Sequence, residues 1–146
     1  MKSALLSLAL FCATGAAQAA PGILSAIESE DLKPVPEAVS LAIGKQAGEC
    51  QLQGEKIALS PNRKITTWFV TTADACDWGA ANGPIWLVAE REASKPVVIL
   101  STGGAAVRIV NNQNSDFPDI AIAGGSAGDN DKNAIYSFNG KKYVKK

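Results

Sequence analysis

Acidic and aromatic side chains gather in one short segment of the chain, Asp74-Ala75-Cys76-Asp77-Trp78-Gly79. A tryptophan beside carboxylates is typical of a sugar platform, because the indole face stacks on a pyranose ring and the carboxylates accept hydrogen bonds from its hydroxyls. The segment therefore predicts a carbohydrate site formed by Asp74, Asp77 and Trp78. The same residues could equally pack over a disulfide.

A second oxygen-rich segment, residues 111–120, resembles the calcium loop of FG-GAP repeats. That loop has the form D-x-[DN]-x-D-G-x-x-D-[LI] and then enters a strand. Aligning its end with Asp119 places Asn111, Gln113, Ser115 and Asp119 at the ligand positions. Only Asp119 is charged, and calcium affinity depends on the number of charged ligands, so we expect weak calcium binding or none. A polar turn that caps its own backbone is the alternative.

The third candidate is the glycine-rich loop 124–133, which carries Asp129, Asn130 and Asp131 in succession. An acidic loop favours association with a cationic partner through electrostatic steering. The loop is therefore a candidate protein-binding surface. A solvated loop at the end of a hairpin is the alternative interpretation.

Histidine is absent from the chain. This removes the commonest general base and every nucleophile that depends on a Ser-His or Cys-His pair. A glycosidase would need two carboxylates about 5 to 10 Å apart, and no acidic pair lies in a recognisable motif. We expect a protein that is not an enzyme.

The distribution of charge is more informative than its sum. The formal net charge is zero, which does not favour nucleic acid as a partner. Acidic residues lie near the start of the chain and basic residues at its end, namely Glu28, Glu30, Asp31 and Glu37 against Lys141, Lys142, Lys145 and Lys146. The basic end could touch an anionic surface or be a solvated terminus.

The beginning of the chain predicts where the protein acts. Lys2, an apolar run from Ala4 to Thr14 and the small-x-small sequence Ala17-Gln18-Ala19 are typical of a secretory signal peptide. We expect cleavage after Ala19 and a secreted domain of residues 20–146, periplasmic or extracellular, with no membrane anchor after cleavage. One domain of this length can bury a single hydrophobic core.

Two cysteines, Cys50 and Cys76, follow the signal segment. An even number of cysteines in an oxidising compartment indicates a disulfide. Closing a loop of about 27 residues contributes roughly 3.5 kcal/mol in the chain-entropy model.

The elements that must position these residues are one helix followed by strands. Val35, Val39, Ile43 and Ala47 recur at every fourth position and predict a short amphipathic helix within residues 34–48, with a helical turn at 23–27 before it. Strands are expected at 56–59, 65–72, 85–90, 96–100, 105–110, 120–123, 134–138 and 142–144.

Turn residues separate these strands, among them Gly103-Gly104 and Asn139-Gly140. The Asn139-Gly140 pair predicts a two-residue type I′ hairpin. Trp68 and Trp86 lie within strands and are expected in the core, whereas Trp78 lies in a turn and is expected to be exposed. The fold class is thus mainly β, a small antiparallel domain with one N-terminal amphipathic helix; sandwich, barrel and propeller all fit the spacing.

The helix, the cysteine after it, the calcium-like loop and the closing Tyr-x-Phe-x-Gly-x-x-Tyr of residues 136–143 form one combination. It resembles small secreted bacterial proteins related to the periplasmic inhibitors of invertebrate-type lysozyme and to immunity proteins against cell-wall-degrading toxins. Such proteins are β-rich and place a loop with a Ser-Gly-x-x-Tyr pattern in the cleft of a peptidoglycan hydrolase; the nearest approach here begins at Ser126, with Tyr136 the next tyrosine.

The resemblance implies a non-enzymatic inhibitor or immunity protein without a cofactor. Its partner-binding residues would be Ser126, Asp129, Asn130, Asp131 and Tyr136. A carbohydrate or cell-wall binding module and an FG-GAP-like structural or adhesive module are the alternatives.

Overall fold

The computed structural model describes residues 22–111, 115–124 and 133–146. Within them the chain forms β1 (Ile23–Ala26), β2 (Lys33–Pro34), α1 (Glu37–Ile43), the 3-10 turn η1 (Gly44–Ala47), β3 (Leu52–Ile57), β4 (Ile65–Thr72), the 3-10 turn η2 (Ala73–Ala75), β5 (Gly83–Arg91), β6 (Val97–Gly104), β7 (Ala106–Asn111), β8 (Asp119–Ala123), β9 (Ala134–Phe138) and β10 (Tyr143–Lys145).

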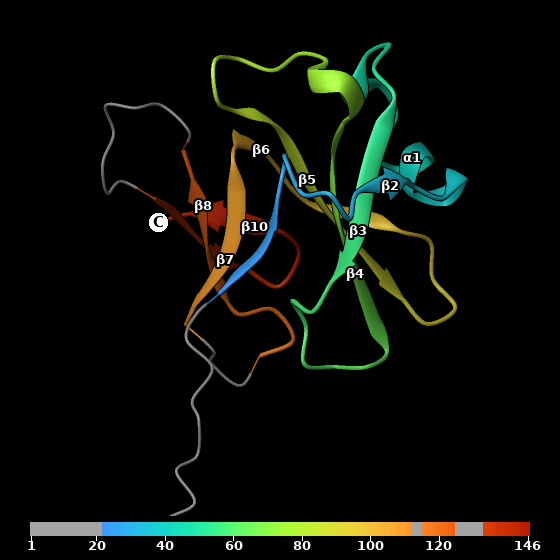
Figure 1. Ribbon diagram of the computed structural model, residues 1–146. Coiled ribbons are helices and arrows are strands. Elements are labelled where there is room, and N and C mark those ends of the chain that lie inside the picture. Colours follow the sequence, from blue (N-terminus) through green and yellow to red (C-terminus); the bar gives the residue numbers. More distant parts are fainter. Residues whose placement is uncertain (1–21, 112–114, 125–132) are drawn as a thin grey trace, which may run out of the picture.

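The strands form two antiparallel five-stranded sheets, which lie side by side in Figure 1. Sheet A has the order β1-β7-β8-β9-β10, and sheet B has the order β2-β3-β4-β5-β6. One core fills the space between them, with buried side chains such as Phe69 and Leu87 from sheet B and Val107 and Ile120 from sheet A. The predicted fold class is confirmed, and its architecture is two facing sheets rather than a closed barrel of the described strands.

Helix α1 covers the outer face of sheet B, on the side away from sheet A (Figure 1). Val39 and Ile43 of the helix pack against Val70, Trp86 and Val88 of β4 and β5. The alternate residues of these two strands face the core between the sheets. Both faces of β4 and β5 are therefore largely buried, which fits the β-branched, aromatic and aliphatic residues that make up most of these strands.

The predicted helix is confirmed, with a tightened end. The α-helical part ends at Ile43, and the 3-10 turn η1 continues to Ala47. Gly44 and Gly48 have φ values of 56° and 60°, a conformation that glycine adopts without a steric cost. The apolar residues at every fourth position therefore predict the buried side of both α1 and η1 correctly.

The segment before the helix differs from the prediction. Ile23–Ala26 is strand β1 and not a helical turn, because it pairs antiparallel with β7 at the edge of sheet A. The short strand β2 was not predicted either, and it pairs with β3. Both strands depend on partners distant in sequence, so local propensity alone could not specify them.

Two predicted turns also differ. Gly103-Gly104 is the end of β6, where Gly104 pairs with Gly83. A Cβ atom on Gly104 would lie 2.4 Å from Ile122 Cγ2, so the absence of a side chain lets the chain pass between the sheets. The hairpin after β9 is confirmed, but the predicted two-residue type I′ turn is wrong. The loop spans four residues, because Phe138 pairs with Tyr143, and of Asn139 and Gly140 only Gly140 has a positive φ.

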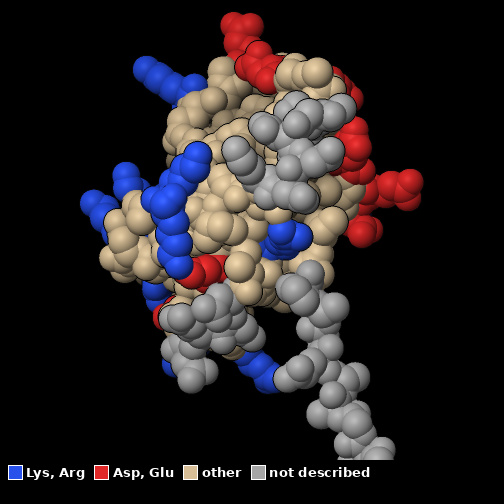
Figure 2. Space-filling model, turned by 90° about the vertical axis from the view of Figure 1, so that its left-hand side faces the viewer, with Lys and Arg blue, Asp and Glu red and all other residues tan. Residues whose placement is uncertain are grey.

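The acidic residues of segment 28–37 and the basic residues of segment 141–146 lie at opposite edges of the sheets. Strands β1 and β2 are the first strands of their sheets, and β6 and β10 are the last. The acidic residues near the start accordingly lie beside β1 and β2, and the basic residues at the end lie on the β9–β10 hairpin. Figure 2, which views the outer side of sheet A, shows Lys and Arg gathered on one side and Asp and Glu along the opposite edge.

No helix among the described residues has the length and apolar content needed to cross a membrane.

Candidate functional site

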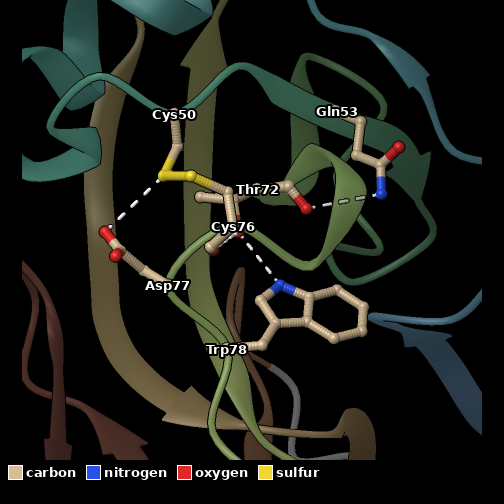
Figure 3. Close-up of a disulfide and its surroundings, with 6 residues drawn as sticks. All are labelled: Cys50, Gln53, Thr72, Cys76, Asp77 and Trp78. Carbon is tan, nitrogen blue, oxygen red and sulfur yellow. Dashed lines mark hydrogen bonds between the residues drawn. A yellow bond between two sulfur atoms is a disulfide. The ribbon is translucent and has the colours of Figure 1, made fainter.

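The Cys50–Cys76 disulfide joins the segment before β3 to the turn after β4 (Figure 3). The two Cα atoms lie 5.8 Å apart, within the usual range for a disulfide. The predicted bridge is therefore present in the structure. The cysteine sulfurs and the Asp77 carboxylate lie within 4.8 Å of one another, but the sulfurs are bonded to each other and are not thiolate ligands in this state.

Trp78 is half-buried rather than exposed, and Figure 3 shows its indole nitrogen directed toward Thr72. Its indole N–H donates a 3.0 Å hydrogen bond to the Thr72 hydroxyl, which in turn donates to the Cys76 carbonyl. The indole also covers Gly83, where a Cβ atom would lie only 2.7 Å from Trp78 Nε1. In the segment predicted to be a sugar platform, Trp78 thus packs against the loop that carries it.

The two carboxylates of that platform are exposed. Asp77 Oδ2 lies 3.5 Å from Cys50 Sγ, beside the disulfide (Figure 3). Asp74 and Asp77 both have positive φ, 53° and 60°, which Asp tolerates better than most residues. The segment reads best as a tight turn fixed by the disulfide and by Trp78.

The calcium-like loop lies partly outside the described residues, since Gln113 and the side chain of Asn111 are not covered. Ser115 donates a 2.7 Å hydrogen bond to the Phe117 carbonyl. Asp119 accepts a 2.7 Å hydrogen bond from the Lys146 ammonium, which holds the pKa of this carboxyl below its usual value. Lys146 therefore competes with calcium for this carboxylate.

Of the predicted partner-binding residues, Ser126, Asp129, Asn130 and Asp131 lie outside the described residues. Tyr136 is described, and it lies half-buried on β9. Its hydroxyl shares a 3.0 Å hydrogen bond with the Thr102 hydroxyl on β6. This contact bridges the edge strand of sheet B and the C-terminal hairpin of sheet A.

A groove lies along this junction, and we name it the β6 groove. Its larger part is a hollow of about 310 Å³, and a second hollow of about 220 Å³ adjoins it at Ile99. The larger part is lined by Ala89, Arg91, Ser94, Lys95, Val97, Ile99, Phe117, Phe138, Gly140 and Lys141. The smaller part is lined by Val98, Ile99, Leu100, Ser101, Tyr136, Lys142 and Tyr143.

Aromatic rings form one wall of the β6 groove. The Phe117 and Phe138 ring centroids lie 4.4 Å apart, and the Tyr143 ring packs edge-on against Phe138 at 5.4 Å. The Tyr143 hydroxyl donates a 2.8 Å hydrogen bond to the Pro118 carbonyl, and burial raises the pKa of Tyr143. The wall is therefore apolar, and the hydroxyl of Tyr143 is already engaged.

Cations surround the mouth of the groove. Arg91, Lys95, Lys141 and Lys142 are all exposed. The Arg91 guanidinium lies 5.7 Å from the Phe117 ring centroid and 3.6 Å from Asp116, so it is fixed over the aromatic wall. An apolar interior with charged groups at the rim is the usual composition of a binding site.

The β6 groove is not predicted by any sequence motif of the chain. Its lining comes from the end of β5, the β5–β6 turn, strand β6, the loop before β8 and the β9–β10 hairpin, which only the fold brings together. The available signal was the position of Lys95 and of the Lys141-Lys142 pair, each directly beside a β-rich run. That signal indicates a basic strand end but does not show that two such ends face one another.

Comparison with protein-family models, with curated proteins and with solved structures finds no match to this chain.

Proposed function

We propose that this chain is a secreted, non-enzymatic binding protein that acts on another protein. The β6 groove is the observation that carries the proposal, because it combines an apolar interior with a charged rim in a surface hollow. Tyr136 lines the groove, and it is the described member of the set that the sequence resemblance assigns to the partner. The resemblance gives the class of partner, a peptidoglycan hydrolase.

The chemistry of the nearby acids supports binding rather than catalysis. Asp116 pairs with Arg91, and Asp119 pairs with Lys146. Lys146 lowers the pKa of Asp119, whereas a general acid in glycoside hydrolysis needs a raised one. The absence of histidine from the sequence points in the same direction.

The geometry supports a protein ligand better than a sugar. A sugar platform needs a free indole face, and the Trp78 indole covers Gly83 with its N–H engaged by Thr72. Secretion to the periplasm or the extracellular space is part of the same proposal. It is supported by the signal-peptide pattern and by the Cys50–Cys76 bridge, which is stable in an oxidising compartment.

The test is the clearing of a cell-wall suspension by a panel of peptidoglycan hydrolases, with and without the purified oxidised protein. We expect the protein to slow clearing by at least one hydrolase and to clear nothing when added alone. Clearing by the protein alone would overturn the non-enzymatic assignment. Unchanged clearing across the panel would remove the hydrolase as the partner class.

A further inference from the structure

The shape of the β6 groove indicates the conformation of what it binds. The two hollows meet at Ile99 and follow β6 from Val97 to Ser101. Five strand residues span about 16 Å at the usual rise of a β-strand. Two adjoining hollows along this length of strand fit an extended segment of about five residues.

The edge of the sheet favours the same conformation. Among the described residues, β6 is the last strand of sheet B and pairs only with β5. An edge strand presents backbone N–H and C=O groups that an extended chain can bind. Strand β10 already contacts β6, too closely for a strand to insert between them at the usual spacing, so a bound segment would lie over the two hollows and not between the two strands.

The apolar side chains of the groove need apolar partners. Val97 is 56% exposed although it lines the larger hollow. Beneath it the lining is buried, with Ile99 and Phe117 only 3% and 4% exposed. Side chains of a bound segment that enter the hollow would cover Val97 and pack on a floor that is already ordered.

The rim selects the charge of the segment. Lys141 and Lys142 line one side, and Arg91 and Lys95 lie at one end. Asp116 forms an ion pair with Arg91, and none of Lys95, Lys141 and Lys142 has an ion-pair partner among the described residues. Successive side chains of an extended segment point to opposite sides. Apolar residues can therefore enter the hollows while the residues between them meet the cations.

We infer that the β6 groove binds an extended, acidic segment of the partner protein, in which apolar residues alternate with Asp or Glu. The inference rests on the proposed function in taking the partner to be a protein. It adds the surface that binds, and the conformation and charge of the bound segment.

The test uses fluorescence anisotropy of three labelled seven-residue peptides with the purified oxidised protein. The first alternates Glu and Val, the second alternates Lys and Val, and the third alternates Glu and Ser. We expect the Glu-Val peptide to bind at least about tenfold more tightly than either other peptide. Equal binding of the Lys-Val peptide would overturn the charge assignment, and equal binding of the Glu-Ser peptide would overturn the role of the apolar lining.

Two pairs of variants locate the binding surface. Lys141→Glu with Lys142→Glu reverses two rim charges, and Lys33→Glu with Lys45→Glu makes the same change of net charge at exposed positions away from the groove. We expect the rim variant to lose about tenfold or more in affinity and the control to stay within about twofold. Equal losses would mean that net charge, and not the groove, governs binding.

Val97→Asp tests the apolar contact, and Leu41→Asp is its control because Leu41 is 72% exposed on α1, across sheet B. We expect only Val97→Asp to weaken binding of the Glu-Val peptide. Sedimentation velocity of the parent and of Val97→Asp adds the remaining outcome. Three results together would overturn the inference: the parent self-associates, Val97→Asp abolishes the self-association, and none of the peptides binds. They would mean that a second copy of the chain occupies the groove.

These results remain distinct from the test of the proposed function. Peptide binding without any effect on clearing would leave the groove assignment in place and remove only the hydrolase. Inhibition of clearing that survives in both Val97→Asp and the rim variant would place the function on another surface and overturn the groove inference.

Discussion

The disulfide turn around Trp78 and the β6 groove lie at opposite ends of sheet B and use their polar residues in opposite ways. In the turn, the hydroxyl of Thr72 and the indole N–H of Trp78 bond within the loop. At the groove, Lys95, Lys141 and Lys142 are exposed beside apolar side chains. A cluster that looks functional in sequence can thus be structural, because its groups already bind one another.

The largest test of this comparison is removal of the disulfide. Replacing Cys50 and Cys76 together by Ala should lower the free energy of unfolding by roughly 3.5 kcal/mol, since the unfolded chain regains the freedom of the closed loop. Urea unfolding of the parent and the double variant measures the difference. Affinity of the Glu-Val peptide, measured well below the melting temperature, should be unchanged. A loss of affinity equal to that of the rim variant would mean that the two regions are not separate.

Trp78→Ala is the next largest change. It removes a half-buried indole and its hydrogen bond to Thr72, and should cost about 2 to 3 kcal/mol, below the range for fully buried aromatic residues. If the sugar platform were the functional site, Trp78→Ala would instead abolish binding to a cell-wall polysaccharide with little effect on stability. Pull-down with insoluble peptidoglycan, run beside the urea experiment, distinguishes the two results.

The contact between Trp78 and Gly83 provides a sharper version of that experiment. Gly83→Ala should cost about 1 to 3 kcal/mol in the parent, because the new Cβ atom meets the indole. In the Trp78→Ala background the same change should cost clearly less, since its clash partner is gone. Additive losses in the double variant would show that the indole does not rest on Gly83.

The fold was predictable to the extent that its elements follow local patterns. The strands 65–72 and 134–138 have the predicted bounds, because each is a run rich in β-branched and aromatic residues. The edge strands β1 and β2 were not predicted, because Ile23–Ala26 is equally compatible with helix and strand until β7 pairs with it. The disulfide was predictable because only Cys50 and Cys76 of the three cysteines follow the expected signal segment, and two cysteines allow one pairing.

The groove was not predictable for a physical reason. Phe117, Phe138 and Ile99 each look like an ordinary core residue in sequence, and they are largely that. They become a surface lining because sheets A and B end side by side at β10 and β6 without joining into a barrel among the described strands. The end of a sheet is a property of the whole topology, and no local pattern encodes it.

Tyr143 combines features of the disulfide turn and of the β6 groove. Its ring lines the groove, and its hydroxyl forms a hydrogen bond within the protein. Tyr143→Phe should cost about 1 kcal/mol, because the Pro118 carbonyl loses its hydrogen bond in a buried position. Burial raises the pKa of Tyr143 above its unfolded value of 10.0, so its contribution to stability is present below pH 10 and is lost as pH rises above that value.

The measurement is urea unfolding of the parent and Tyr143→Phe at pH 8 and pH 11. The parent should lose more stability than the variant between the two pH values, and lysine titration is common to both proteins. An identical loss would show that the phenol is as accessible to base in the folded protein as in the unfolded one.

The smallest expected effect on stability is at the rim. Lys141→Glu with Lys142→Glu should change the free energy of unfolding by no more than about 0.5 kcal/mol, because both side chains are exposed and neither takes part in an ion pair among the described residues. Their backbone N–H groups, which bond to the Asn139 side chain, are unaffected by the substitution. A stability near that of the parent, together with lost peptide affinity, would separate the rim from the disulfide turn most clearly. It would show that these lysines are dispensable for the fold and required for peptide binding. A stability loss comparable to that of Trp78→Ala would instead show that the hairpin charges stabilise the fold, and the difference between the two regions would not hold.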